Sequence, residues 1–100
     1  MYKITKAEYL DSFQLDHVPA ELNDPYLKSL WYDRKGDWNN AHRLADSLDD
    51  FRGKRIHAYL HRKEGDIWNA DYWYRKAYMS RPEISLDEEW TQIVDSIFNE

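Results

Sequence analysis

Two short segments of the chain share a Gly-Asp pair followed by an alanine at the same spacing. Residues 35–41 read KGDWNNA and residues 64–70 read EGDIWNA, so Gly36 and Gly65 lie 29 residues apart, as do the aspartates and the alanines. Glycine readily adopts the left-handed conformation that ends one helix, and the aspartate that follows can cap the next helix. Each segment therefore predicts a helix–turn–helix hairpin, and the chain uses this hairpin twice.

Capping sequences mark further helix starts. The segments TKAE at Thr5 and SLDE at Ser85 have the form of a capping box, in which the side chains at both ends bind backbone amides. Asp24 and Pro25 combine a capping acid with a proline at the first helical position. Apolar residues recur at helical spacing, and almost none alternate with the period of two that is typical of strands. We therefore expect an all-α fold.

We expect one domain over residues 1–100, built from two hairpins and two outer helices. The segment DDFRG at 49–53, which contains Gly53, is interpreted as a break between the hairpins. Each hairpin leaves an apolar face uncovered, so the outer helices are expected to cap the two ends of the stack. The expected boundaries are 5–13 for the N-terminal helix, 22–50 for the first hairpin, 51–82 for the second hairpin, which Pro82 closes, and 85–98 for the capping helix.

Small and aromatic residues surround the second Gly-Asp turn in a characteristic order. They are Ala58, Gly65, Asp66, Ala70, Tyr74, Ala77 and Pro82. This order resembles the tetratricopeptide repeat (TPR), and residues 22–50 match it less closely because Leu48 replaces an alanine. The offset of 29 residues is also shorter than the usual repeat of about 34. The resemblance implies a TPR-like fragment of an α-α superhelix.

The sequence carries no sign of an enzymatic activity. It contains three glycines and no nucleophile elbow, phosphate loop or glycine-rich fingerprint, so we expect no enzyme and no cofactor. The segment HAYLHRKEGD at 57–66, with the NADYWYRKA that follows, also resembles small bacterial proteins of uncharacterised function. That resemblance implies the same fold and carries no activity.

Composition indicates a cytoplasmic protein. The chain has no cysteine, which excludes disulfides and thiolate metal sites and fits a reducing compartment. No apolar stretch approaches the roughly 18 residues of a membrane span, and the N-terminal segment lacks the apolar run of a signal peptide. We therefore expect no membrane partner.

The basic charge is concentrated in one segment of an acidic chain. Residues 52–63 carry five basic side chains and no acid, whereas the net charge of the whole chain is −5. In TPR proteins the first helix of each hairpin lines a concave face that binds peptides. Applied to this chain, the resemblance places the following residues on that face: Tyr26, Leu30, Asp33, Arg34, Arg55, Tyr59, Arg62 and Lys63.

Three functions are compatible with this pattern. The main prediction is a module that binds an acidic peptide or protein segment, because arginine forks bind carboxylates in a bidentate manner. The plainer interpretation is a solvated helix face whose charges pair with neighbouring acids. A nucleic-acid-associated protein is the alternative, although the acidic remainder of the chain disfavours a long polyanion, and a metal-binding protein is the weaker alternative.

The metal hypothesis rests on two histidines. His57 and His61 are four residues apart and Glu64 follows three later, so all three could share one helix face and bind Zn²⁺, Cu²⁺ or Ni²⁺. The sequence favours packed or hydrogen-bonded histidines over a metal site, because Arg62 and Lys63 lie beside them.

The last two groups of residues considered are an aromatic cluster and a pair of neighbouring acids. Trp68, Tyr72 and Trp73 are expected to pack in the core against the last helix, and the sharper interpretation makes them the contact of a homo-oligomer. The neighbouring acids Glu88 and Glu89 are expected to form part of a solvated face, because consecutive helical residues point in different directions.

Overall fold

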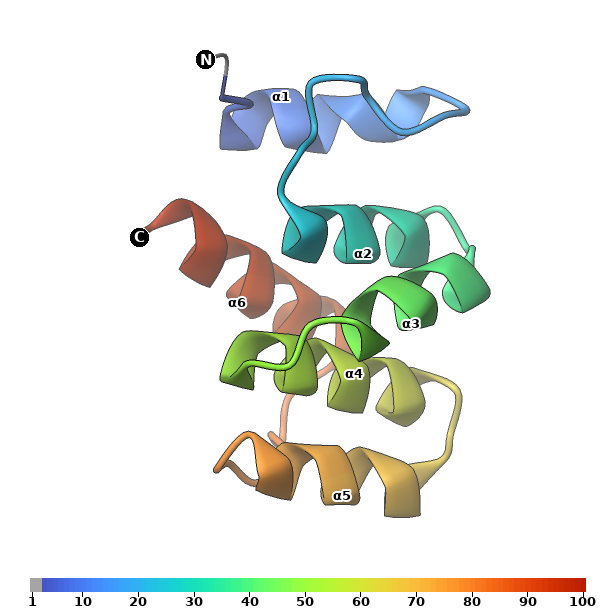
Figure 1. Cartoon of the computed structure of the whole chain (residues 1–100), viewed down its shortest axis with the longest axis vertical. Helices are drawn as coiled ribbons and strands as arrows, with labels where there is room; N and C mark the ends of the chain where they lie inside the picture. Colours follow the sequence, from blue (N-terminus) through green and yellow to red (C-terminus); the bar gives the residue numbers. More distant parts are fainter. Residues whose placement is uncertain (1–2) are drawn as a thin grey trace.

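The computed structural model describes residues 3–100, and within that range it contains no strand (Figure 1). The all-α prediction is therefore confirmed; the first two residues of the expected 1–100 domain lie outside the described range. The helices are α1 (Lys6–Asp11), continued by a 3₁₀ turn (Ser12–Gln14), α2 (Pro25–Arg34), α3 (Trp38–Asp46), α4 (Phe51–Lys63), α5 (Ile67–Lys76) and α6 (Leu86–Phe98). None of these helices is long and apolar enough to cross a membrane.

The predicted helix starts are confirmed. Thr5 and Ser85 both form complete capping boxes at α1 and α6. An aspartate caps each of the other four helices by accepting hydrogen bonds from backbone amides of the first turn. Three of these caps, Asp24, Asp37 and Asp66, were predicted, whereas the cap by Asp50 was not, because the sequence prediction placed a break at 49–53.

Three helices end in the same kind of left-handed turn. Gly36 and Gly65 have φ angles of 85° and 88°, and the amide of the residue after each glycine donates to the carbonyl five residues before it. After α5 the same place is taken by Tyr78, with a φ of 58°. Helix α5 therefore ends in this turn, before the loop that contains Pro82, and not at the proline as the sequence suggested.

Gly53 lies inside α4 and is not a break. Asp50 caps the helix by accepting from the Gly53 amide at 2.9 Å. A Cβ atom at position 53 would lie 2.2 Å from the carbonyl oxygen of Leu48. Gly53 therefore allows the connection from α3 to approach α4 closely. The prediction that 49–53 is a break is wrong at Gly53, which is part of the helix.

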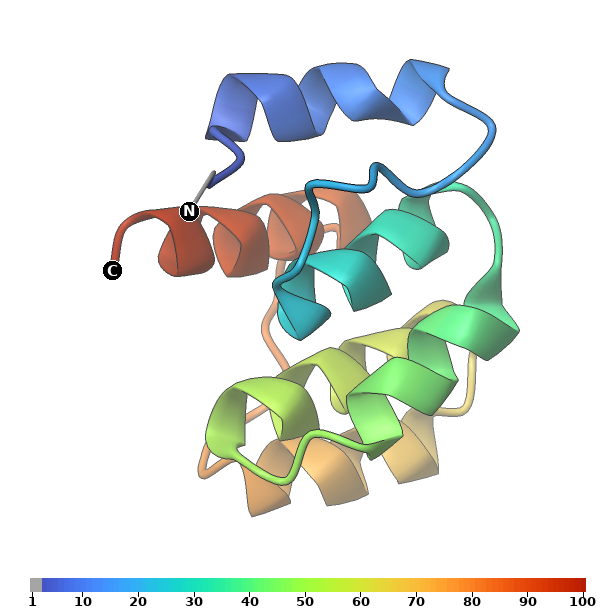
Figure 2. The ribbon, with the colours of Figure 1, turned by 45° about the horizontal axis from the view of Figure 1, so that its top comes forward.

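The last helix packs on the side of the hairpins and not on their end. Helices α2 with α3 and α4 with α5 form two antiparallel hairpins, and α6 lies beside α2 and α4 (Figure 1). The Trp90 indole donates to the Leu30 carbonyl at 3.2 Å, and the Tyr9 ring stacks on the Trp90 ring. Helix α1 lies over α2 and α6 (Figure 2). Within residues 3–100, no segment covers the outer face of α5, where Trp68 and Tyr72 are exposed.

The aromatic cluster of α5 is therefore divided between two environments. Trp68 is 73% exposed and Tyr72 is 37% exposed, so the prediction that they pack in the core against α6 is wrong. Trp73 is the exception, since it is half-buried against His57. The sharper interpretation, a contact of a homo-oligomer, stays a prediction.

Candidate metal centre

Helix α6 occupies the face on which the sequence predicted a peptide. Leu30 and Tyr59 are buried. The Arg62 guanidinium donates to Glu89 at 2.9 Å and also bonds the Ile84 carbonyl, while Arg55 lies 3.7 Å from the same carboxylate. The acidic group that contacts this basic face, Glu89, therefore belongs to α6 of the same chain.

The remaining predicted groove residues are also engaged within the chain. Arg34 pairs with Asp87 of α6 at 3.3 Å, and Lys63 pairs with the buried Asp33 at 2.8 Å. Tyr59 donates to the same Asp33 at 2.9 Å. Tyr26 bonds Asp50. The structure thus gathers Arg55 and Arg62 around Glu89 of α6.

All five basic residues of 52–63 have an acidic partner. Arg52 pairs with Glu100 and Lys54 lies 3.9 Å from Asp49, in addition to the three pairs described above. Peptide binding stays a prediction, and it would require α6 to leave this face. Nucleic-acid binding also stays a prediction, but the basic residues of α4 that it would use are already paired with acids of the chain.

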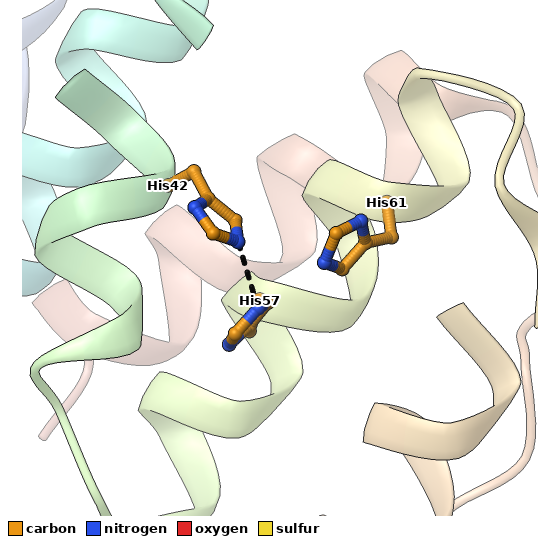
Figure 3. Close-up of side chains that lie close together, drawn as sticks. All are labelled: His42, His57 and His61. Carbon is orange, nitrogen blue, oxygen red and sulfur yellow. Dashed lines mark hydrogen bonds between the residues drawn. The ribbon is translucent and has the colours of Figure 1, made fainter. Parts of the chain in front are cut away.

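Three histidines from two hairpins converge between α3 and α4. His57 and His61 share one face of α4, as their spacing predicted, and His42 of α3 completes the group (Figure 3). One ligand nitrogen from each lies within 4.8 Å of the others. The Nε2 atoms of His42 and His57 are 2.9 Å apart. This distance requires that one Nε2 donates and the other accepts, so the two rings do not both carry a proton there.

Sequence reasoning missed His42. It lies on a helix of the other hairpin, so no local motif links it to His57 and His61. The available signal was a second stripe on α3, in which Trp38, His42 and Asp46 follow one another at four-residue intervals. This stripe faces α4, while Ala41 and Ala45 are the buried residues of α3.

Aromatic rings and carboxylates hold the three imidazoles in place. Trp38 stacks on His42 at a centroid distance of 4.7 Å, and Trp73 stacks on His57 at 4.0 Å. The Glu64 carboxylate lies 2.7 Å from His61 Nδ1. Carboxylates bonded to Nδ1 orient a histidine so that Nε2 can bind a metal. Glu64, which the sequence offered as a third ligand, is therefore placed to orient His61.

Asp46 lies on the Nδ1 side of His57 but does not bond it. Its carboxylate oxygen is 3.8 Å from His57 Nδ1, beyond direct hydrogen-bond distance. Each of the two α4 histidines thus has a carboxylate on its Nδ1 side. Their Nε2 atoms remain as the ligand atoms directed to the centre of the group.

Burial keeps His42 and His57 neutral near pH 7. Desolvation, followed by the charges of His42 and His61, lowers the pKa of His57 to about 4, and desolvation also lowers the pKa of His42. Neutral imidazole is the form that binds a metal ion. Protons therefore compete weakly for these two rings at physiological pH.

The metal-free protein is expected to lose about 2 kcal/mol of stability between pH 7 and pH 5 through His57. The unfolded chain binds a proton on this ring near pH 6.5, whereas the folded chain does so only near pH 4, so acidification favours unfolding. Urea unfolding in EDTA at the two pH values measures the loss. His57→Phe should abolish most of it and His17→Ala should not; an unchanged stability at pH 5 would contradict the lowered pKa.

Comparisons with protein-family models, with curated proteins and with solved structures found no match for this chain. The chemistry of its side chains is therefore the basis on which a function can be inferred.

Proposed function

We propose that the protein binds one divalent transition-metal ion through His42, His57 and His61. The convergence of three imidazole nitrogens within 4.8 Å carries this proposal. Imidazole suits Zn²⁺, Cu²⁺ and Ni²⁺, and three histidines leave a fourth position for water. The lowered pKa of two of the rings supports it, because these rings need not release a proton before they bind.

The metal-free spacing is close to the spacing that a bound ion needs. In a tetrahedral site with Zn–N bonds of about 2.0–2.1 Å, neighbouring nitrogens lie about 3.3 Å apart. His42 and His57, at 2.9 Å, need to separate by a few tenths of an ångström. A ligand nitrogen of His61 lies within 4.8 Å of those of the other two rings, and the ring is turned toward them (Figure 3). The three rings are therefore already gathered near the place that one ion would occupy.

A bound ion would join the two hairpins. His42 belongs to α3 of the first hairpin, whereas His57 and His61 belong to α4 of the second. An ion that binds the folded chain and not the unfolded chain stabilises the fold in proportion to its affinity and concentration. The role proposed here is that of a metal-binding helical-repeat protein in which the ion fixes the angle between the repeats.

We also propose that the two hairpins are TPR-like. The repeated Gly-Asp turns and the buried alanines Ala41, Ala58 and Ala70 support this proposal. The position of α6 beside α2 and α4 corresponds to the face on which TPR proteins bind peptides. In this chain, a helix of the protein itself takes that place.

Titration calorimetry with Zn²⁺, Cu²⁺ and Ni²⁺ tests the metal site. We expect one ion per chain, and we expect His42→Ala or His57→Ala to weaken binding by at least about 100-fold, because each removes one of three ligands. His17→Ala is the matched control, since His17 is the fourth histidine and lies in an exposed loop away from the cluster. Glu64→Gln should weaken binding by about 10- to 100-fold through His61.

Far-UV circular dichroism of each metal-free variant shows whether a loss of binding reflects a loss of folding. His42 is half-buried, and its replacement leaves the larger part of the core intact. We therefore expect His42→Ala to stay folded, so that a loss of binding in this variant reports the loss of a ligand. If none of the three ions binds at neutral pH, or if binding survives both substitutions and is lost in His17→Ala, the cluster is a hydrogen-bonded packing arrangement and the proposal is wrong.

A further inference from the structure

A small pocket lies between the start of α4, the turn after α5 and the second half of α6. The start of α4 and the end of α5 lie on the same side of the molecule (Figure 1). The pocket has a volume of about 210 Å³, and Phe51, Met79 and Ile93 supply apolar walls from the three elements. Arg52 and Arg55 also line it, and none of its lining residues in the described chain is acidic. The pocket therefore combines an apolar surface with positive charge.

Arg55 has few hydrogen-bond partners for a guanidinium that is so little exposed. Its side chain is 21% exposed, and its Nε atom is buried without a hydrogen-bond partner. The Glu89 carboxylate lies 3.7 Å from this Nε, beyond hydrogen-bond distance, and Nη2 makes one long bond of 3.4 Å to Gln92. Arg62, by contrast, donates both to Glu89 and to the Ile84 carbonyl. Buried polar groups of folded proteins nearly always have partners, so we expect Arg55 to take a further acceptor from outside the chain.

Arg52 brings a second guanidinium to the same pocket. It precedes Arg55 by three residues, so the two side chains are neighbours on one face of α4. Arg52 pairs with Glu100 and lies over the Tyr26 ring, 5.2 Å from the ring centroid. Glu89, the acid that Arg55 approaches, already accepts hydrogen bonds from other residues. Arg55 can therefore bind a further carboxylate without taking a hydrogen bond from the core, and the charge of Arg52 lies beside it.

We propose that this pocket binds a small molecule with one carboxylate on an apolar body. Arginine binds carboxylates through paired N–H groups, so the ligand carboxylate accepts from the Nη groups of Arg55, beside the charge of Arg52. The hydrocarbon part of the ligand covers Phe51, Met79 and Ile93, which removes apolar surface from water. Pockets for drug-sized ligands measure about 300–1,000 Å³, so a pocket of about 210 Å³ selects a smaller one, such as a short-chain or aromatic acid. The proposal does not depend on the metal site, to which this pocket contributes no ligand.

Chemical-shift titration of the isotope-labelled protein in EDTA, with hexanoate, hexylamine and hexanol, tests the pocket without bound metal. The three probes share one hydrocarbon chain, and we expect hexanoate to bind at least about tenfold more tightly than the other two, because charge-assisted hydrogen bonds are the stronger ones. Acetate should bind at least about tenfold more weakly than hexanoate, since it lacks the apolar part. An acetylated tripeptide that ends in leucine should also bind more weakly than hexanoate. Tighter binding of this peptide would overturn the assignment to a small free acid.

Two variants of Ser96, an exposed residue of α6 that lines the pocket, form a matched pair. Ser96→Glu should weaken hexanoate binding by about tenfold or more, because the new carboxylate pairs with the arginines in place of the ligand. Ser96→Gln has the same size without the charge and should bind like the original chain. Arg55→Lys should weaken binding because it keeps the charge and loses the fork, whereas Arg43→Gln, on α3, should not. No binding of hexanoate, equal binding of hexanoate and hexylamine, or equal binding by the two Ser96 variants would each overturn the proposal.

Discussion

Glu89→Ala is expected to lower the free energy of unfolding by roughly 3–5 kcal/mol, because it leaves the partly buried guanidinium groups of Arg55 and Arg62 without their counter-charge. The Glu89 side chain is completely buried. It accepts from the Tyr74 hydroxyl at 2.7 and 2.8 Å and from Arg62 at 2.9 Å, and Arg55 lies 3.7 Å away. This one carboxylate of α6 therefore holds side chains of both α4 and α5. Guanidinium unfolding followed by circular dichroism measures the loss.

Asp87→Ala is the matched comparison, two residues earlier on the same helix. Asp87 also pairs with an arginine, Arg34, at 3.3 Å, but its side chain is 88% exposed. Exposed ion pairs contribute about 0–1 kcal/mol, so this variant should unfold almost like the original chain. Equal losses for the two variants would mean that Glu89 does not anchor α6.

Gly53→Ala is expected to destabilise the protein by about 1–3 kcal/mol, because the added methyl group overpacks a fixed backbone contact. Inside an ordinary helix, replacing glycine by alanine gains up to about 1 kcal/mol, so the expected sign is the reverse of helix propensity. The new Cβ would lie 2.2 Å from the Leu48 carbonyl oxygen and 2.5 Å from the Leu48 Cβ. A side-chain rotation cannot relieve a clash with the backbone.

Thermal or urea unfolding measures the effect of Gly53→Ala. Lys54→Ala, at the next position of α4, is the control, since Lys54 has a single loose ion pair at 3.9 Å and should change the stability by less than about 1 kcal/mol. If Gly53→Ala stabilises the protein, the connection after α3 is free to move away from α4 and the close approach is not required.

Local features of the fold could be predicted from the sequence, whereas long-range placements could not. Capping acids and Gly-Asp turns act on their nearest backbone neighbours, so Asp66 and Gly65 appear in the structure as expected. Apolar residues at helical spacing predict that one face of a helix is buried, but they do not identify the surface that covers it. For the same reason Glu89, which looks like a solvated acid in the sequence, is completely buried.

The candidate metal site shows the same difference between local features and long-range placements. His57 and His61 were found because both lie on one helix, at a spacing that puts their side chains on one face. His42 was missed because its proximity depends on how α3 packs against α4. Gly53 was misread because a glycine gives the same sequence signal for a helix break and for a close contact.

The hydrogen bond from Trp90 to Leu30 joins residues that are 60 positions apart. Closing so long a loop costs conformational entropy before its contacts form, whereas each hairpin closes over a short turn. We therefore expect the hairpins to form early in folding and α6 to dock late. During synthesis on the ribosome α6 also emerges after the other five helices. Until then the nascent chain exposes Arg55, Arg62 and the apolar face of α2, which makes this the stage at which it is most exposed to aggregation or to capture by a chaperone.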